Sequence, residues 1–249
     1  MQYQAHRGVC TECPENTMPA FQRAYEQGYP IIELDPKFTK DNVCVVLHDF
    51  YLNRTCRTAD GQQLEGKVHI TEVTWEELQT LDAGLWFGEE FKGTKVPMLR
   101  EVLAFAREKG IHIKIDNVFA RFPAEQQQLM FDLVEASGAD AGFTCPDEAT
   151  VEAVVARFPN AVIHYDGPVD EARVLAVKAL LKNNPLTVWL PLDCPGTSWF
   201  RYPKASTELC AMVKQHGKLG IWILSTPEED AQAKAFGADI IETTGALKP

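Results

Sequence analysis

Short apolar segments alternate with longer amphipathic segments along most of the chain. The amphipathic segments carry apolar residues at helical spacing, and several end at a glycine, which is typical of helix C-termini. The apolar segments are short and sit between turn signals, as buried strands do. We predict strands at residues 3–6, 31–35, 111–116, 141–144, 161–165, 187–192, 219–224 and 238–243.

Strands that alternate with single helices favour the α/β class, and eight such units predict a (β/α)8 TIM barrel. One interval breaks the alternation: about 75 residues separate the second predicted strand from the third, with a further strand and a further helix among them. We expect this excursion, at about 36–110, to be inserted between barrel strands 2 and 3. Because no repeat or Pro/Gly/Ser-rich linker divides the sequence, we predict one domain over 1–249.

The composition limits the partners of this protein. The 249 residues are 45% hydrophobic, which suffices for one large core, and 24 basic against 35 acidic residues give a net charge of -11. That charge repels polyanions and argues against nucleic acid as a partner. The sequence has no signal-peptide pattern and no run of about 18 apolar residues. We therefore expect a cytoplasmic protein without stable membrane insertion that binds a small molecule, and the sequence does not indicate its oligomeric state.

Residues able to carry out chemistry gather at the ends of the predicted strands, where barrels of this type place their active sites. The first strand ends at His6 and Arg7, the second at Glu33 and Asp35, and the excursion strand at His48. Residues two apart on a strand point the same way, so the two carboxylates form an oxygen-rich pair suited to Mg²⁺ or Ca²⁺. Imidazoles can transfer protons, and a guanidinium suits a phosphate.

Six motifs then occur in order within about the first 105 residues: HRG, PENT, ELD, VVLHD, LNRT and VPMLREVL. In sequence and spacing they resemble the glycerophosphodiester phosphodiesterase family. The resemblance implies a phosphoric diester hydrolase of lipid metabolism that uses a divalent metal to cleave glycerophosphodiesters into glycerol 3-phosphate and an alcohol. It further implies His6 and His48 as general acid and base, Glu33 and Asp35 as metal ligands, and Arg7 as a phosphate ligand.

The PENT motif has an expected structural role. The resemblance implies that Glu15 and Asn16 support Arg7 from behind. Asn16 is also a favourable cap for a helix that begins near Thr17, with Pro19 in its first turn. We therefore predict Glu15 as the support of the arginine and Asn16 as the helix cap.

The third predicted strand departs from the family pattern. Family members usually carry Glu-x-Lys there, whereas this chain has Lys114 and Asp116 in the reverse order. Both side chains still point inward, with Asp116 about 6.5 Å nearer the barrel mouth. In one interpretation Asp116 completes the metal site and Lys114 binds the substrate. In the other, Lys114 lies beneath the site and neutralises Glu33 and Asp35, so that metal binding weakens or disappears.

A second departure lies near the C-terminus, where IWILS and IIETT replace the usual Trp-Thr-x-Asn and Ile-Thr-Asp patterns. Trp222 is retained and is expected to wall the substrate pocket. Two alternatives to glycerophosphodiester hydrolysis follow from the two departures. One is the same mechanism acting on another phosphodiester, such as a lysophospholipid or a sugar-linked diester. The other is a phosphoester-binding barrel without turnover.

Cys10 and Cys13 have the two-residue spacing of a zinc or redox pair. Zinc would need two further ligands, and the sequence has no second such pair. We predict that the two cysteines fill an ordinary loop, with reversible disulfide formation as the alternative. His112, His164 and His216 lack comparable neighbours and are expected to be structural.

Overall fold

The computed structural model describes residues 1–193 and 203–249. Eight parallel strands close into a barrel in the order β1-β10-β9-β8-β7-β6-β5-β2, which confirms the predicted fold. Each strand lies within one or two residues of its prediction. The strands are β1 (Gln2–His6), β2 (Ile31–Leu34), β5 (His112–Ile115), β6 (Ala141–Cys145), β7 (Ile163–Tyr165), β8 (Leu186–Pro191), β9 (Lys218–Leu224) and β10 (Ile240–Thr243).

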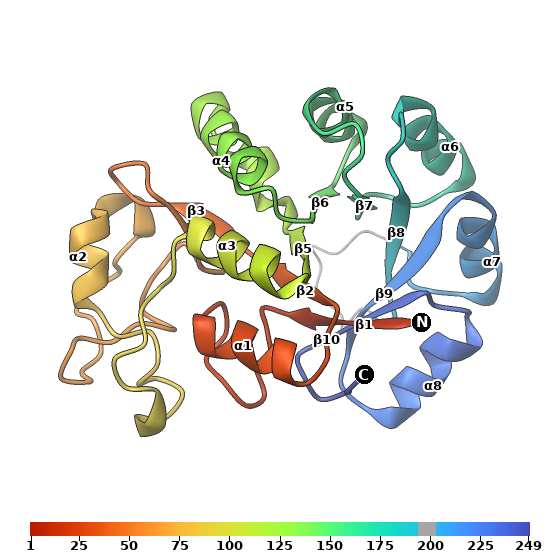
Figure 1. The fold of residues 1–249 in the computed structure, drawn as a ribbon. Coiled ribbons are helices and arrows are strands. Elements are labelled where there is room, and N and C mark those ends of the chain that lie inside the picture. Colours follow the sequence, from red (N-terminus) through yellow and green to blue (C-terminus); the bar gives the residue numbers. More distant parts are fainter. Residues whose placement is uncertain (194–202) are drawn as a thin grey trace.

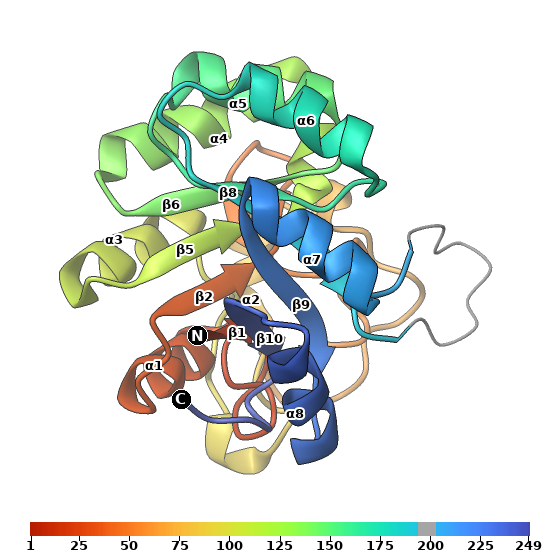
Figure 2. The same cartoon turned by 90° about the vertical axis from the view of Figure 1, so that its right-hand side faces the viewer.

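Helices surround the barrel (Figures 1 and 2). Their apolar stripes face the strands, as the predicted helical spacing requires. After β10, residues 244–249 contain no helix, so the last predicted unit consists of a strand alone. None of the helices in the described ranges is both long and apolar enough to cross a membrane. The ring helices are α1 (Met18–Glu26), α3 (Leu99–Lys109), α4 (Ala124–Ser137), α5 (Glu148–Arg157), α6 (Glu171–Leu180), α7 (Thr207–His216) and α8 (Pro227–Ala235).

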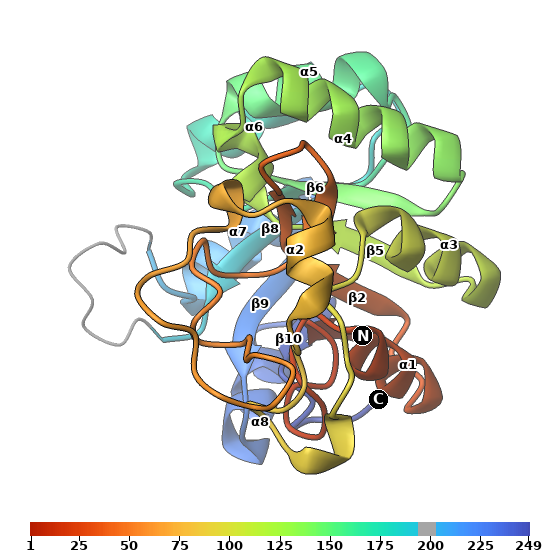
Figure 3. The same ribbon diagram turned by 90° about the vertical axis from the view of Figure 1, so that its left-hand side faces the viewer.

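The excursion lies on one side of the barrel (Figure 3). It starts with the antiparallel pair β3 (Pro36–Phe38) and β4 (Cys44–Val46). Because α3 belongs to the ring, the excursion covers 36–98, shorter than predicted. Its helical elements are η1 (Ile70–Glu72), α2 (Trp75–Thr80) and η2 (Glu89–Phe91).

β4 joins the excursion to the barrel through its alternating side chains. Cys44 and Val46 pack into the main core, whereas Val45 and Leu47 pack into a separate, smaller core of the excursion. Successive strand residues point to opposite sides, so this short strand contributes to both cores. The residue that follows Leu47 is His48, which is thereby held at the barrel mouth.

The barrel interior below the mouth is filled by a bulky polar stack. The Trp189 indole Nε1 donates to His164 Nδ1 at 3.1 Å, and His164 Nε2 lies 3.3 Å from His112 Nε2. Two glycines make room for these rings: a Cβ on Gly220 would lie 2.4 Å from the Trp189 ring, and one on Gly142 would lie 2.7 Å from His164 Nε2. These contacts support the structural role predicted for His112 and His164.

Candidate active site

The register of three neighbouring strands places the predicted residues together. His6 on β1 pairs with Glu33 on β2, which pairs with Lys114 on β5. Asp35 and Asp116 lie two residues further along, where β2 and β5 end. Residues more than 100 positions apart in sequence therefore meet at the C-terminal end of the barrel, where such barrels place their chemistry.

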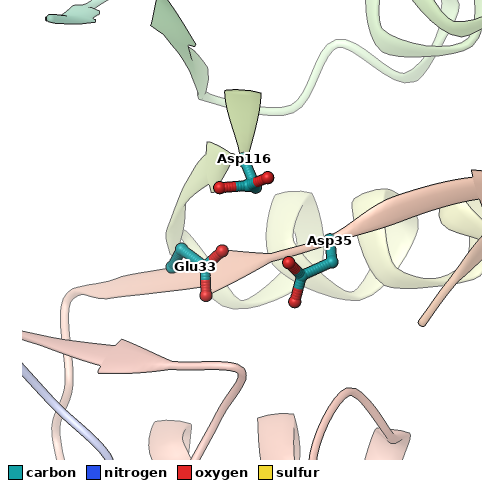
Figure 4. Close-up of side chains that lie close together, drawn as sticks. All are labelled: Glu33, Asp35 and Asp116. Carbon is teal, nitrogen blue, oxygen red and sulfur yellow. The ribbon is translucent and has the colours of Figure 1, made fainter. Parts of the chain in front are cut away.

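Three carboxylates form the centre of this site. Glu33, Asp35 and Asp116 each offer an oxygen within 4.8 Å of the others, and Figure 4 shows them gathered around one space. Burial, followed by the charge of Asp35, raises the pKa of Glu33 well above its usual value and also raises that of Asp116. A bound cation would relieve this repulsion, and three clustered carboxylates suit a hard divalent ion.

Lys114 lies level with Glu33 on the neighbouring strand, and its ammonium pairs with Glu242, which was not among the predicted site residues. Its Nζ lies 2.8 Å from Glu242 Oε2 and 3.9 Å from the centre of the Trp189 ring. Burial lowers the pKa of Lys114, but the charges of Glu242 and then Glu33, with the hydrogen bond to Glu242, make the net shift upward. The direct partner of the buried ammonium is thus Glu242 rather than Glu33 or Asp35.

His6 lies beside the carboxylate cluster. Its Nε2 lies 3.9 Å from Glu33 Oε2, and the ring is largely buried. Burial lowers the pKa of His6 to about 4, although Glu242 partly opposes this. The His6 imidazole is therefore neutral near pH 7 in the metal-free protein and can accept a proton.

Arg7 has a left-handed backbone, with φ 58°, that a residue with a side chain adopts only at a cost. This conformation turns its guanidinium over the cluster, with Nε 3.4 Å from Asp35 Oδ2. Nη1 donates to Glu15 Oε1 at 3.1 Å, so Glu15 contacts Arg7 as predicted. The backbone N–H of Arg7 donates to Glu33 Oε2 at 3.0 Å. The arginine thus contacts three carboxylates at once.

Asn16 does not cap helix α1, and that prediction was wrong. The cap position is occupied by Thr17, and α1 begins at Met18. Asn16 has φ 55°, which directs its side chain away from the helix, and its Nδ2 donates to Asp35 Oδ2 at 2.7 Å. Burial raises the pKa of Asp35, but Arg7, followed by His48, Lys37 and the hydrogen bond from Asn16, makes the net shift downward. Asn16 therefore fixes a carboxylate of the cluster.

His48 is oriented by the residue that follows it. Its Nδ1 lies 2.6 Å from Asp49 Oδ1. Burial raises the pKa of Asp49, but hydrogen bonds from Arg54 and His48 make the net shift downward, so this carboxylate is an acceptor. Nδ1 therefore carries the proton in the neutral ring, which leaves Nε2 as the nitrogen available for proton transfer.

Two cavities open on either side of the carboxylate cluster. His6 and Trp222 line the larger, of about 790 Å³, together with Asp166, so Trp222 walls a cavity at the site as expected. His48 lines the smaller, of about 390 Å³. Both cavities reach Asp116 and the short helix η3 (Asn117–Arg121). The two predicted acid–base histidines thus face two adjoining spaces.

Several charged residues of the site were not predicted from the sequence, although the sequence positions of three of them indicated a place in it. Lys37 continues the period-two series of Glu33 and Asp35, and Glu242 occupies an inward position on β10. Asp166 directly follows β7, and burial raises its pKa to about 7. Asp49 lies in the VVLHD motif and Arg54 in the LNRT motif, and neither had been given a predicted role.

Cys10 and Cys13 are both free thiols in the loop after β1. The Cys10 thiol donates to the His6 carbonyl at 3.1 Å. Burial raises the pKa of both thiols, which disfavours the reactive thiolate. Neither cysteine belongs to a three-ligand group within the described ranges. These contacts support the predicted loop-filling role.

Residues 6–152, more than half of the chain, match the model of the glycerophosphoryl diester phosphodiesterase family. A glycerophosphodiester phosphodiesterase from Caldanaerobacter subterraneus is 38% identical over 128 residues, which cover 51% of this chain and 49% of that protein. One from Bacillus subtilis is 31% identical over 138 residues, covering 52% and 44%. The match therefore spans about half the length of the curated relatives.

Solved structures share the fold over nearly the whole chain. A phosphodiesterase from Oleispira antarctica, in complex with the product sn-glycerol-3-phosphate, has a TM-score of 0.77 at 20% identity and covers 99% of this chain and 94% of that one. A glycerophosphodiester phosphodiesterase from Agrobacterium tumefaciens has a TM-score of 0.70 at 22% identity and covers 99% of both chains. Because the family model matches residues 6–152, the chain belongs to the glycerophosphoryl diester phosphodiesterase family.

Proposed function

We propose that this protein hydrolyses glycerophosphodiesters to glycerol 3-phosphate and an alcohol, with a divalent cation held by Glu33, Asp35 and Asp116. The observation that carries the proposal is the position of this cluster between two histidine-lined cavities. A relative of the same fold was solved with sn-glycerol-3-phosphate as its product, which agrees with this substrate class.

The charges of the site suit a phosphodiester monoanion. The guanidinium of Arg7 offers a planar fork for nonbridging phosphate oxygens, and its contacts with Glu15 and Asp35 hold it in place. When bound, the cation would act as a Lewis acid on the phosphate and neutralise its charge. The ion pair of Lys114 is with Glu242 rather than with a carboxylate of the cluster, which supports a cation as the counter-charge there.

The two histidines supply the proton transfers. One removes a proton from the attacking water, or from a neighbouring hydroxyl of the substrate, and the other protonates the departing alkoxide. Their places in adjoining cavities let one act on the nucleophile and the other on the leaving group. For His48, the contact with Asp49 presents Nε2 to the substrate.

A second substrate class has support in the smaller cavity. Phe50 and Tyr51 line it beside His48, and 39% and 47% of their respective surfaces are exposed. Such rings would pack against an apolar group of the substrate. The same mechanism would then act on a diester that carries such a group, for example a lysophospholipid, whose acyl chain stays on the glycerol phosphate product while the head-group alcohol departs.

The test is an assay of the purified chain with glycerophosphocholine, with a lysophospholipid and with an aryl phosphodiester. Each is measured with chelator and after addition of Mg²⁺, Ca²⁺ or Mn²⁺. We expect release of glycerol 3-phosphate from glycerophosphocholine that chelator abolishes and metal restores. Preference for the lysophospholipid would favour the second substrate class. Binding of glycerol 3-phosphate without hydrolysis of any diester would contradict both and indicate a non-catalytic barrel.

A further inference from the structure

We propose that Arg54 is a positioning residue that clamps His48 and Arg7 into one unit across the boundary between excursion and barrel. The inference rests on the proposed function, because it concerns the acid–base histidine and the phosphate-binding arginine of that reaction. Arg54 itself is absent from the residues that line the two cavities. It acts through the two carboxylates that contact these groups.

The contacts form an unbroken chain of charge-assisted bonds. Asp49 bonds His48 Nδ1 through one oxygen and accepts from Arg54 Nε through the other, at 2.5 Å. The opposite edge of the same guanidinium donates two bonds to Glu15, from Nη1 at 2.8 Å and from Nη2 at 2.7 Å. Glu15 in turn accepts from Arg7 at 3.1 Å.

The geometry requires an arginine rather than a cation of any kind. A guanidinium has N–H groups on separate edges of a rigid plane, so one edge can bond Asp49 while the other bonds Glu15. An ammonium is a point charge and does not reproduce this forked pairing. Arg54 bonds two charged partners. It therefore differs from a residue in an isolated surface ion pair, which generally contributes little to stability.

The two ends of the clamp belong to different parts of the chain. His48 follows β4 in the excursion, whereas Arg7 follows β1 of the barrel. Within this network, the Arg54–Glu15 contact joins side chains 39 residues apart. The relative position of an acid–base group and a phosphate ligand thus depends on one guanidinium.

Kinetics of Arg54→Ala and Arg54→Lys test the clamp. Loss of such an orienting partner typically costs about 10- to 100-fold in activity, so we expect Arg54→Ala to lower kcat by that factor and to raise KM. Added guanidinium, at a few tens of millimolar, should restore part of the loss. Arg54→Lys should stay close to Arg54→Ala.

Arg23→Ala is the matched control. Arg23 also contacts two carboxylates, Glu12 and Glu26, and its side chain is 42% exposed, the same fraction as that of Arg54. We expect its kcat and KM to stay within about twofold of wild type, as for other surface changes. Equal kinetics of Arg54→Ala and wild type, or absence of rescue by guanidinium, would overturn the proposal.

A second readout does not need turnover. In ¹⁵N-histidine NMR, Glu15→Gln should shift the His48 ring signals when Arg54 is present and leave them in place when Arg54 is alanine. The His48 signals are assigned by their loss in His48→Ala, and Glu12→Gln serves as the control. An equal shift in both backgrounds would disprove the clamp. Failure of every diester assay with the NMR coupling intact would instead reject the proposed function alone.

Discussion

The ammonium of Lys114 lies 2.8 Å from Glu242 Oε2, across the barrel from its own strand. Lys114 and Asp116 are two residues apart in the sequence, but this pairing keeps the lysine charge apart from the Asp116 carboxylate. Lys114 is paired with Glu242, and Asp116 lies with Glu33 and Asp35 in the carboxylate cluster. With the reversed order on β5, three clustered carboxylates are still present that could hold the proposed cation.

The first prediction concerns His48, one of the two histidines proposed as general acid and base. His48→Asn should lower kcat by about 100- to 10,000-fold, because a proton transfer in the transition state is lost. His48 is 40% exposed, so the free energy of unfolding should change by no more than about 0.5 kcal/mol. Stopped assays and urea unfolding measure the two quantities. Full activity of His48→Asn would remove His48 from the mechanism, and His216→Asn on α7 is the control.

The second prediction concerns Asp116, the third of the proposed metal ligands. Asp116→Asn should weaken Mn²⁺ or Mg²⁺ binding by about tenfold or more, because ligand charge sets affinity at such sites. The Asp116 side chain also accepts from Val118 N at 2.9 Å, a contact that asparagine retains. Titration calorimetry measures the affinity, with Asp132→Asn on α4 as the control. Equal affinity of Asp116→Asn and wild type would exclude Asp116 as a ligand.

The third prediction concerns the buried pair. Lys114→Met should destabilise the fold by about 3–5 kcal/mol, since Glu242 would be left as a buried charge without its cation. Adding Glu242→Gln to this variant should recover much of the loss. Denaturant unfolding of both variants and of the wild type gives the comparison. A Lys114→Met variant as stable as wild type would contradict the pairing of Lys114 with Glu242.

The fourth prediction concerns pH. Burial raises the pKa of Asp166 from 3.8 to about 7 in the folded state. Its contribution to stability is therefore complete below about pH 3.8 and is lost as the pH rises through about 7. Metal-free wild type should lose stability relative to Asp166→Asn over that window. A difference between the two unfolding curves that stays constant with pH would contradict the assignment.

Much of the fold was predictable because apolar strands and amphipathic helices leave local periodic patterns. The eight strands, and the gathering of His6, Glu33 and Asp35 at their ends, follow from that pattern. The direction of Asn16 was not predictable, since it depends on a positive φ that an N-terminal cap would not adopt. The pairing of Lys114 with Glu242 was not predictable either, because it depends on the closure of the barrel between β1 and β10.

The excursion illustrates the same limit. His48 and Asp49 are adjacent in sequence, so their contact is local. The contact between Arg54 and Glu15 depends on how the excursion packs against the barrel, a packing to which Cys44 and Val46 contribute on one side of β4 and Val45 on the other. The sequence motifs contain Arg54 and Glu15, but only the tertiary arrangement brings the two side chains into contact.

Anomalous diffraction from crystals soaked in Mn²⁺ tests the central claim most directly. We predict one strong peak between Glu33, Asp35 and Asp116, with the Lys114 ammonium against Glu242. A map without a peak there, in which the Lys114 ammonium lies between Glu33 and Asp35, would contradict the account.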